Sequence, residues 1–475
     1  MLPNGDAWLS HVERGLSPYW MAESAYGQPV GNFPTFRCDN GDVLDVTAPC
    51  DELANHSWIR AEFGRDYTRM KSRQIYAYGV RYHLTGDTKA LELAKAGVDY
   101  LTQELRDKEH GGAISYRENG KAGLDWRQRT SQDQAYAIVG LAFYYYLTRD
   151  PDVEQVLIEQ QAFIFDQYRS DNNDQLLWVL KDSGNDKHVQ RELVAQLDQI
   201  NGYMLLVMPL LPEPYQKKWR DDLEWLTKQM IALYHDDEEW RFYGAIHHPA
   251  MMKINAKHND FGHTIKAYWM TYLVGQALDN PKWQRFAETG MEKTLERAAF
   301  SYPKTNLIGV LSDAEYQSIP FDEIYSWQSK PYSYGVSSWQ WAELDQALMT
   351  LAMKQGKQLD PALVKQLFFT TTSFQQYWVD QQYGGVGLMP KSVKQFHWGN
   401  GYHQFEHALV GYLSAQAWYQ QPATLYYALP DNSDASLQPY YFNGKELERS
   451  VSEISIDKLG LKQVRTRFMM NEKNQ

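Results

Sequence analysis

Two histidines begin apolar helical segments of this sequence, and their positions suggest proton-transfer chemistry. His263 lies in the polar stretch KHNDFGHTIK, which leads into the apolar run AYWMTYL, and His403 lies in WGNGYHQFEHAL. Imidazole has an unperturbed pKa near neutrality, so it suits a base that removes a proton from a carbon beside a carbonyl. The resulting enediolate needs a nearby cation, and Arg73 in SRQIYAYGV is a candidate because its guanidinium stays charged and can bind two oxygens.

The second histidine segment also permits an interpretation based on a metal ion. The run HQFEH, from His403 to His407, fits the H-x-x-E-H pattern, in which one helix face presents two zinc ligands. A third ligand would have to come from the short tail, and the pattern gives His263 no role. A zinc peptidase is therefore a remote alternative, and we expect no metal and no cofactor. His407, one turn after His403, could instead replace it as the acid/base group.

Helical periodicity dominates the chain and must position these residues. Every second predicted helix is apolar nearly all round, as in AYAIVGLAFYYYL, NGYMLLVMPLL and HALVGYLSAQAW, which indicates burial on all sides. These apolar helices recur about every 65 residues, with one longer step. The twelve predicted helices start near residues 6, 66, 88, 131, 152, 195, 213, 260, 281, 338, 360 and 402.

The alternation predicts an all-α fold, an (α/α)6 barrel of six helical hairpins with six inner and six outer helices. An open α-solenoid shows the same alternation, but the count of six favours closure. Glycine-rich segments at 109–116, 238–246 and 381–389 suggest hairpins at one end, which place His263 and His403 at a common mouth. We expect the barrel over residues 1–420 and a C-terminal extension over 421–475, where the Asn-Gly pair in PYYFNGKEL indicates a small β element.

Composition narrows the possible partners and location. The net charge is −12 without a basic block, so nucleic acid is not an expected partner. The longest apolar run, GYMLLVMPLL, is too short to span a bilayer, and the first residues lack a secretory signal pattern. Cys38 and Cys50 could pair, but so few thiols in an acidic chain favour a cytoplasmic location. Aromatic residues make up 14% of the chain, enough to fill a core and to line a sugar pocket.

Four segments resemble motifs of the N-acylglucosamine 2-epimerase superfamily, in the same order: KSRQIYAYG, NDFGHTIK, SSWQWAELDQAL and WGNGYHQFEHAL. The resemblance covers about residues 1–420, and it implies an (α/α)6 barrel acting on sugars. It implies that His263 and His403 are catalytic and that Arg73 assists them at the substrate. Glu406 and His407 stand where many relatives have an arginine. The residues that we expect to bind the substrate are Asn201, Trp339, Glu343, Trp398, Glu406 and His407.

Two further departures from the family pattern bear on the reaction. Lys266 stands where most members have glutamate, and Leu205 stands where several epimerases have another histidine. The overall pattern is closer to the mannose isomerase members. It implies interconversion of D-mannose and D-fructose through an enediolate, with a monosaccharide as the only partner and a monomer or homodimer as the assembly.

Three other functions stay open. A sugar 2-epimerase of the glucose/mannose, cellobiose or N-acylglucosamine type is the main alternative, because both reactions begin with removal of the C2 proton. A glycoside hydrolase on the same fold would need two carboxylates across the pocket, and no spacing selects a pair among Asp260, Glu343 and Glu406. A sugar-binding barrel without catalysis is the third possibility.

Overall fold

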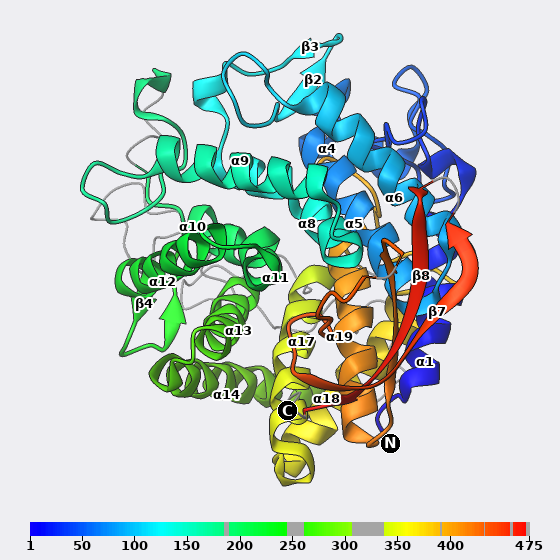
Figure 1. Ribbon diagram of the computed structural model, residues 1–475, viewed down its shortest axis with the longest axis vertical. Helices are drawn as coiled ribbons and strands as arrows, with labels where there is room; N and C mark the ends of the chain where they lie inside the picture. Colours follow the sequence, from blue (N-terminus) through cyan, green and yellow to red (C-terminus); the bar gives the residue numbers. More distant parts are fainter. Residues whose placement is uncertain are drawn as a thin grey trace.

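The computed structural model describes residues 1–184, 190–244, 261–305, 337–389, 392–431, 433–456 and 459–471, and these are mostly helical (Figure 1). Each of the twelve predicted helix starts lies within two residues of an observed start. The outer helices are α1 (Gly5–Ser10), continued by η1 (His11–Leu16) and α2 (Ser17–Trp20), α6 (Thr88–Tyr100), α9 (Pro151–Tyr168), α12 (Tyr215–Tyr234), α14 (Pro281–Thr305) and α18 (Pro361–Ser373). The inner helices are α5 (Thr68–Thr85), α7 (Ser131–Tyr136) with α8 (Val139–Thr148), α10 (Leu193–Gln199) with α11 (Leu205–Val207), α13 (Phe261–Ala277), α17 (Ser338–Gln355) and α19 (Tyr402–Trp418).

The inner helices form a closed ring, which confirms the (α/α)6 barrel. Each inner helix packs against the next one along the chain, and the last, α19, packs against the first, α5. An open solenoid would lack this last contact. The inner helices are buried nearly all round, and every residue of α8 is buried. The apolar sequence pattern therefore corresponds to helices that are covered both by their ring neighbours and by the outer helices.

Local capping signals determine where many of these helices begin. Asp87, Asp150 and Asp360 each accept a hydrogen bond from a backbone N–H in the first turn of α6, α9 and α18. At α17 the backbone N–H of Ser337 donates to the Gln340 side chain, as in a capping box. Caps of this kind contribute about 0.5–2 kcal/mol each. They hold the first turns of the helices in place, including the turn of α17 that faces the cavity described below.

Short antiparallel strands connect some of the hairpins, and a larger sheet follows the barrel. The connecting strands are β1 (Arg65–Tyr67), β2 (Tyr116–Glu118), β3 (Lys121–Ala122), β4 (His235–Asp236) and β5 (Arg241–Phe242). The C-terminal extension forms a sheet in the order β6-β8-β7, from β6 (Ala423–Leu429), β7 (Gly444–Ile456) and β8 (Leu461–Met470). The sheet packs on α5, α8 and α19, and it shares one hydrophobic core with the barrel.

The Asn-Gly pair of the extension does not form a tight hairpin. Gly444 is the first residue of β7, and β8 lies between β6 and β7 in the sheet. The chain therefore crosses from β6 to β7 through residues 430–443, and this crossing carries Tyr440 into the core of the barrel. The division into a barrel and a separate extension stays a prediction.

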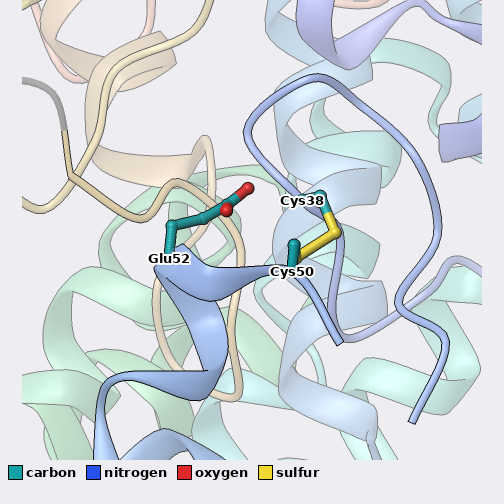
Figure 2. A group of neighbouring side chains, drawn as sticks. All are labelled: Cys38, Cys50 and Glu52. Carbon is teal, nitrogen blue, oxygen red and sulfur yellow. A yellow bond between two sulfur atoms is a disulfide. The ribbon is translucent and has the colours of Figure 1, made fainter. Parts of the chain in front are cut away.

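Cys38 and Cys50 form a disulfide in the segment before α5 (Figure 2). The carboxylate of Glu52, drawn beside them, accepts a hydrogen bond from the backbone N–H of Asp39 at 2.8 Å. The disulfide loop is connected to the rest of the protein through a β-bridge between Arg37 and residue 395. It thus supports the segment that precedes α19. Among the described residues, no helix has the length and hydropathy of a membrane span.

Candidate active site

A cavity of about 550 Å³ lies at the end of the barrel where the inner helices begin. Figure 1 shows α13, α17 and α19 side by side, and their first turns contribute side chains to this cavity. Of the nine predicted site residues, five line the cavity: Arg73, His263, Trp339, Trp398 and His403. The barrel thus brings together residues that are more than 300 positions apart in the sequence.

Trp339 lies between the two predicted catalytic histidines. Its ring centroid is 4.8 Å from that of His263 and 5.9 Å from that of His403. Burial, followed by the positive charges of Lys266 and Arg73, lowers the pKa of His403 well below its usual range. His403 is therefore neutral at neutral pH, which is the state that a general base requires.

Arg73 is held in place by aromatic rings and a backbone carbonyl. Its guanidinium lies 3.9 Å from the ring centroid of Tyr136, and its Nη1 donates to the carbonyl oxygen of Trp398 at 2.9 Å. The Trp398 ring, 39% exposed, stacks on Trp58 at a centroid distance of 5.1 Å. No sequence pattern pointed to Trp58, because it lies far from every motif in the sequence. It meets Trp398, at the cavity, only through the tertiary fold.

Lys266, the departure from the family pattern, is a cation in the cavity wall. Its Nζ donates to Asp198 Oδ1 at 3.1 Å and lies 3.9 Å from Glu343 Oε1. Burial alone would lower the pKa of Lys266, but Asp198 and the other anionic neighbours outweigh burial and raise it. The amide oxygen of Asn201, turned toward Lys266, accepts a further hydrogen bond from Nζ at 3.3 Å and one from Tyr402 Oη at 3.1 Å. Asn201 therefore supports the cavity wall from behind.

Two buried carboxylates lie behind His403. The Oε1 atom of Glu343 is 3.3 Å from His403 Nδ1, and neither Glu343 nor Glu406 lines the cavity. Gln346 Nε2 donates to both carboxylates, at 3.4 Å to Glu343 and 3.3 Å to Glu406. Burial is the largest cause that raises the pKa of each glutamate, and Glu343 raises the pKa of Glu406 further. The raised pKa values, about 7 for Glu343 and about 8 for Glu406, favour a single proton shared by the two carboxylates at neutral pH.

The position of these glutamates argues against a glycoside hydrolase. Glu343 and Glu406 lie on the same side of the cavity, joined through Gln346, whereas hydrolysis requires carboxyl groups on either side of the glycosidic bond. The third candidate carboxylate, Asp260, lies outside the described residues.

His407 does not reach the cavity. Its Nε2 lies 2.8 Å from Asp345 Oδ2, both side chains are fully buried, and the ring packs between Trp8 and Phe374. One helical turn below His403, the barrel wall is closed by side chains from α17 and α1. We therefore leave His407 out of the proposed site, and the zinc arrangement with two histidines on one metal is not formed.

Three side chains near the cavity carry atoms of the kinds that bind metal ions. Ligand atoms of Glu343, His403 and Glu406 lie within 4.8 Å of one another. However, Lys266 already places a positive charge beside Glu343, and Gln346 donates to both carboxylates. Three of the four carboxylate oxygens accept a hydrogen bond from Gln346 or Tyr440. The fourth, Glu343 Oε1, lies beside the positive charge of Lys266, so we assign no metal to the group.

Comparison with known proteins supports the same kind of barrel. The solved structure of cellobiose 2-epimerase from Spirochaeta thermophila is 15% identical, with a TM-score of 0.64 over 87% of this chain and 96% of that one. A D-mannose isomerase is 13% identical, with a TM-score of 0.64 over 86% and 97%. Cellobiose 2-epimerase from Bacillus thermoamylovorans is 15% identical, with a TM-score of 0.62 over 86% and 98%. At these identities the similarity shows the fold alone.

Sequence comparison supplies the family. A search of curated protein sequences found no significant match. The profile of the N-acylglucosamine 2-epimerase (GlcNAc 2-epimerase) family matches residues 60–385, which is more than half of the chain. This range contains five of the six inner helices and the first of the two cavity histidines. The chain therefore belongs to the N-acylglucosamine 2-epimerase family.

Proposed function

We propose that this sugar isomerase or epimerase interconverts D-mannose and D-fructose by proton transfer through an enediolate. The observation that carries the proposal is the arrangement around His403. Its Nδ1 faces the Glu343 carboxylate at 3.3 Å, and its pKa is depressed by burial and by nearby cations. This arrangement supports a neutral imidazole whose second nitrogen, Nε2, is left for the substrate.

In the proposed reaction His403 removes the proton from C2 of the open-chain aldose. The C2–H electrons form the C1–C2 double bond, and the carbonyl electrons move to O1, which gives the enediolate. Arg73 and Lys266 place positive charge in the cavity wall, where it stabilises the charge that develops on the oxygen. His403 then returns the proton to C1 while the O2 proton moves to O1, which leaves the C2 carbonyl of the ketose. His263 is assigned to ring opening and to the hydroxyl protons.

A 2-epimerase is the second candidate, and one observation favours it. Both His263 and His403 border the same cavity, with Trp339 between them, so each could serve one face of C2. The inference against epimerisation from Leu205 stays a prediction. Leu205 lines a separate crevice with Tyr441 and Phe442 of the extension and is not among the residues that line the cavity. The isomerase proposal therefore depends on the Glu343–His403 pair and on the cations of the wall.

The cell compartment stays a prediction, and one observation argues against the cytoplasm. Disulfides persist mainly in oxidising compartments, and Cys38 and Cys50 are joined. Thiol labelling of the protein from its natural source, before and after reduction, would decide the matter. Free thiols before reduction would support the cytoplasmic prediction. Monomer or homodimer likewise stays a prediction, to be tested by light scattering.

Proton NMR of D-mannose with a catalytic amount of protein in D₂O tests the proposed reaction. We expect D-fructose to appear with deuterium incorporated at carbon. Formation of D-glucose without D-fructose would refute the isomerase proposal and establish a 2-epimerase. If D-mannose is unchanged while cellobiose or an N-acylglucosamine is converted, the substrate assignment is wrong and the chemistry of the site stands.

A further inference from the structure

The C-terminal extension reaches the centre of the barrel through Tyr440, which lies outside the range matched by the family profile. Tyr440 is fully buried, and its hydroxyl donates to Glu406 Oε1 at 2.7 Å. The same hydroxyl lies 2.9 Å from Tyr76 Oη of the inner helix α5. A residue of the extension therefore contacts a carboxylate of the buried group behind His403.

The backbone of Tyr440 adopts a conformation that a tyrosine rarely takes. Its φ is +58°, in the left-handed region that favours glycine, and such residues persist only when the surrounding structure holds them. Here the backbone N–H donates to Tyr146 Oη at 2.8 Å, and the ring packs on Tyr441 at a centroid distance of 3.9 Å. The chain tolerates this strain at a position where the side chain is directed into the barrel.

From Tyr440 a continuous series of contacts leads to the catalytic histidine. Glu406 accepts from Tyr440 with Oε1 and from Gln346 with Oε2. Gln346 also donates to Glu343, whose other oxygen is 3.3 Å from His403 Nδ1. Tyr440, Glu406, Gln346 and Glu343 are buried, so the charge on the two carboxylates is poorly screened by water.

We propose that Tyr440 is a positioning residue that controls where the proton shared by Glu406 and Glu343 resides, and thereby the charge beside His403. The inference rests on the proposed function of His403 as the base. The Tyr440 hydroxyl donates to the ionised form of Glu406, which lets this carboxylate lose its proton at a lower pH. Loss of the shared proton leaves a second negative charge behind His403. This charge holds the proton that His403 has taken from C2 too firmly for its return to C1, so turnover falls.

Several charged and titratable groups act on Glu406, so Tyr440 must be separated from the others. Burial and Glu343 raise the pKa of Glu406, while Tyr440, Lys266 and Gln346 lower it. The groups that face or act on Glu406 from the surrounding elements are Glu343 and Gln346 of α17, Lys266 of α13, Tyr76 of α5, Tyr402 of α19, and Tyr440 and Tyr441 of the extension.

Tyr440→Phe removes only the hydroxyl and tests this proposal. A hydrogen bond to a charged group is worth about one pKa unit. We expect the alkaline limb of the pH profile of kcat/KM to shift to a pH about one unit higher, because without the Tyr440 hydroxyl Glu406 keeps its proton up to a higher pH. The acid limb should stay in place. Tyr427→Phe is the matched control, since this buried hydroxyl of the same extension donates to the carbonyl of Gln438 and does not contact Glu406.

A second measurement does not depend on activity. Groups whose folded-state pKa is raised stabilise the fold below their unfolded pKa, and this stability is lost as the pH rises through the folded pKa. The decline of Tm with rising pH should therefore extend about one unit further in Tyr440→Phe than in the parent or Tyr427→Phe. Identical pH profiles and identical Tm–pH curves for both variants would overturn the proposal. A parent protein inactive on every sugar would instead refute the proposed function, while the Tm curves still test Tyr440.

Discussion

The pair formed by Glu343 and His403 makes a quantitative prediction for the variant Glu343→Gln. As His403 takes the C2 proton, a positive charge develops 3.3 Å from the Glu343 carboxylate. When the shared proton lies on Glu406, Glu343 is ionised, and with an effective dielectric constant of about 20 a full charge pair at this distance is worth about 5 kcal/mol. A half-transferred proton in the transition state would experience about 2.5 kcal/mol, so replacing the carboxylate with an amide should lower kcat by about 70-fold.

The KM of this variant should change little, because the Glu343 side chain does not line the cavity. The assay is the initial rate of conversion of D-mannose, or of whichever sugar is turned over, across a range of substrate concentrations. Exchange of the C2 proton with D₂O should fall in parallel with kcat, since the base acts in that step.

A matched carboxylate on the same helix provides the control. Asp345, two residues along α17, is as buried as Glu343 and pairs with His407 of α19, but neither of these residues lines the cavity. Asp345→Asn should lower Tm and leave kcat within about threefold of the parent. If Glu343→Gln keeps more than about a third of kcat, or if both variants lose kcat equally, the carboxylate does not act on the base.

Four other outcomes are expected. His263→Ala and His403→Ala should each lower kcat by about 10²–10⁴-fold with unchanged circular dichroism, and a variant retaining more than about a tenth of the rate would remove that histidine from the chemistry. Lys266→Met should destabilise the protein by about 3–5 kcal/mol in urea unfolding, because it leaves Asp198 buried without its cation. Dialysis against a chelator should leave the rate unchanged, whereas stoichiometric metal together with lost activity would place an ion at the glutamates behind the base. Cys38→Ser should lower the free energy of unfolding by up to about 3 kcal/mol, as expected for a closed loop of this length, and leave kcat unaffected.

Local sequence patterns were sufficient to predict the helices of this protein. Caps such as Asp150 before Pro151 specify where a helix begins, and an apolar surface all round specifies that it is buried. Both signals act over a few residues, so they can be read without knowing the fold. The two cavity histidines were found in the same way, because each stands at the start of such a helix.

The tertiary structure decided which side chains reach the cavity. His403 and His407 are one turn apart on α19, yet only His403 faces the cavity, because α17 and α1 close the wall below it. Leu205 faces a different crevice, and Lys266 acquires its role from Asp198. These outcomes depend on partners far away in the sequence.

The sequence by itself determined the helical hairpins, their alternation and the family to which the chain belongs. Closure of the ring, the pairing of Glu343 with His403, and the reach of Tyr440 into the barrel were decided only by the tertiary structure. The physical reason is the range of the interactions. Helix formation and capping depend on neighbours within about four residues. A buried charged side chain instead pairs with a residue on another helix, far away in the sequence, and no local sequence pattern identifies that residue.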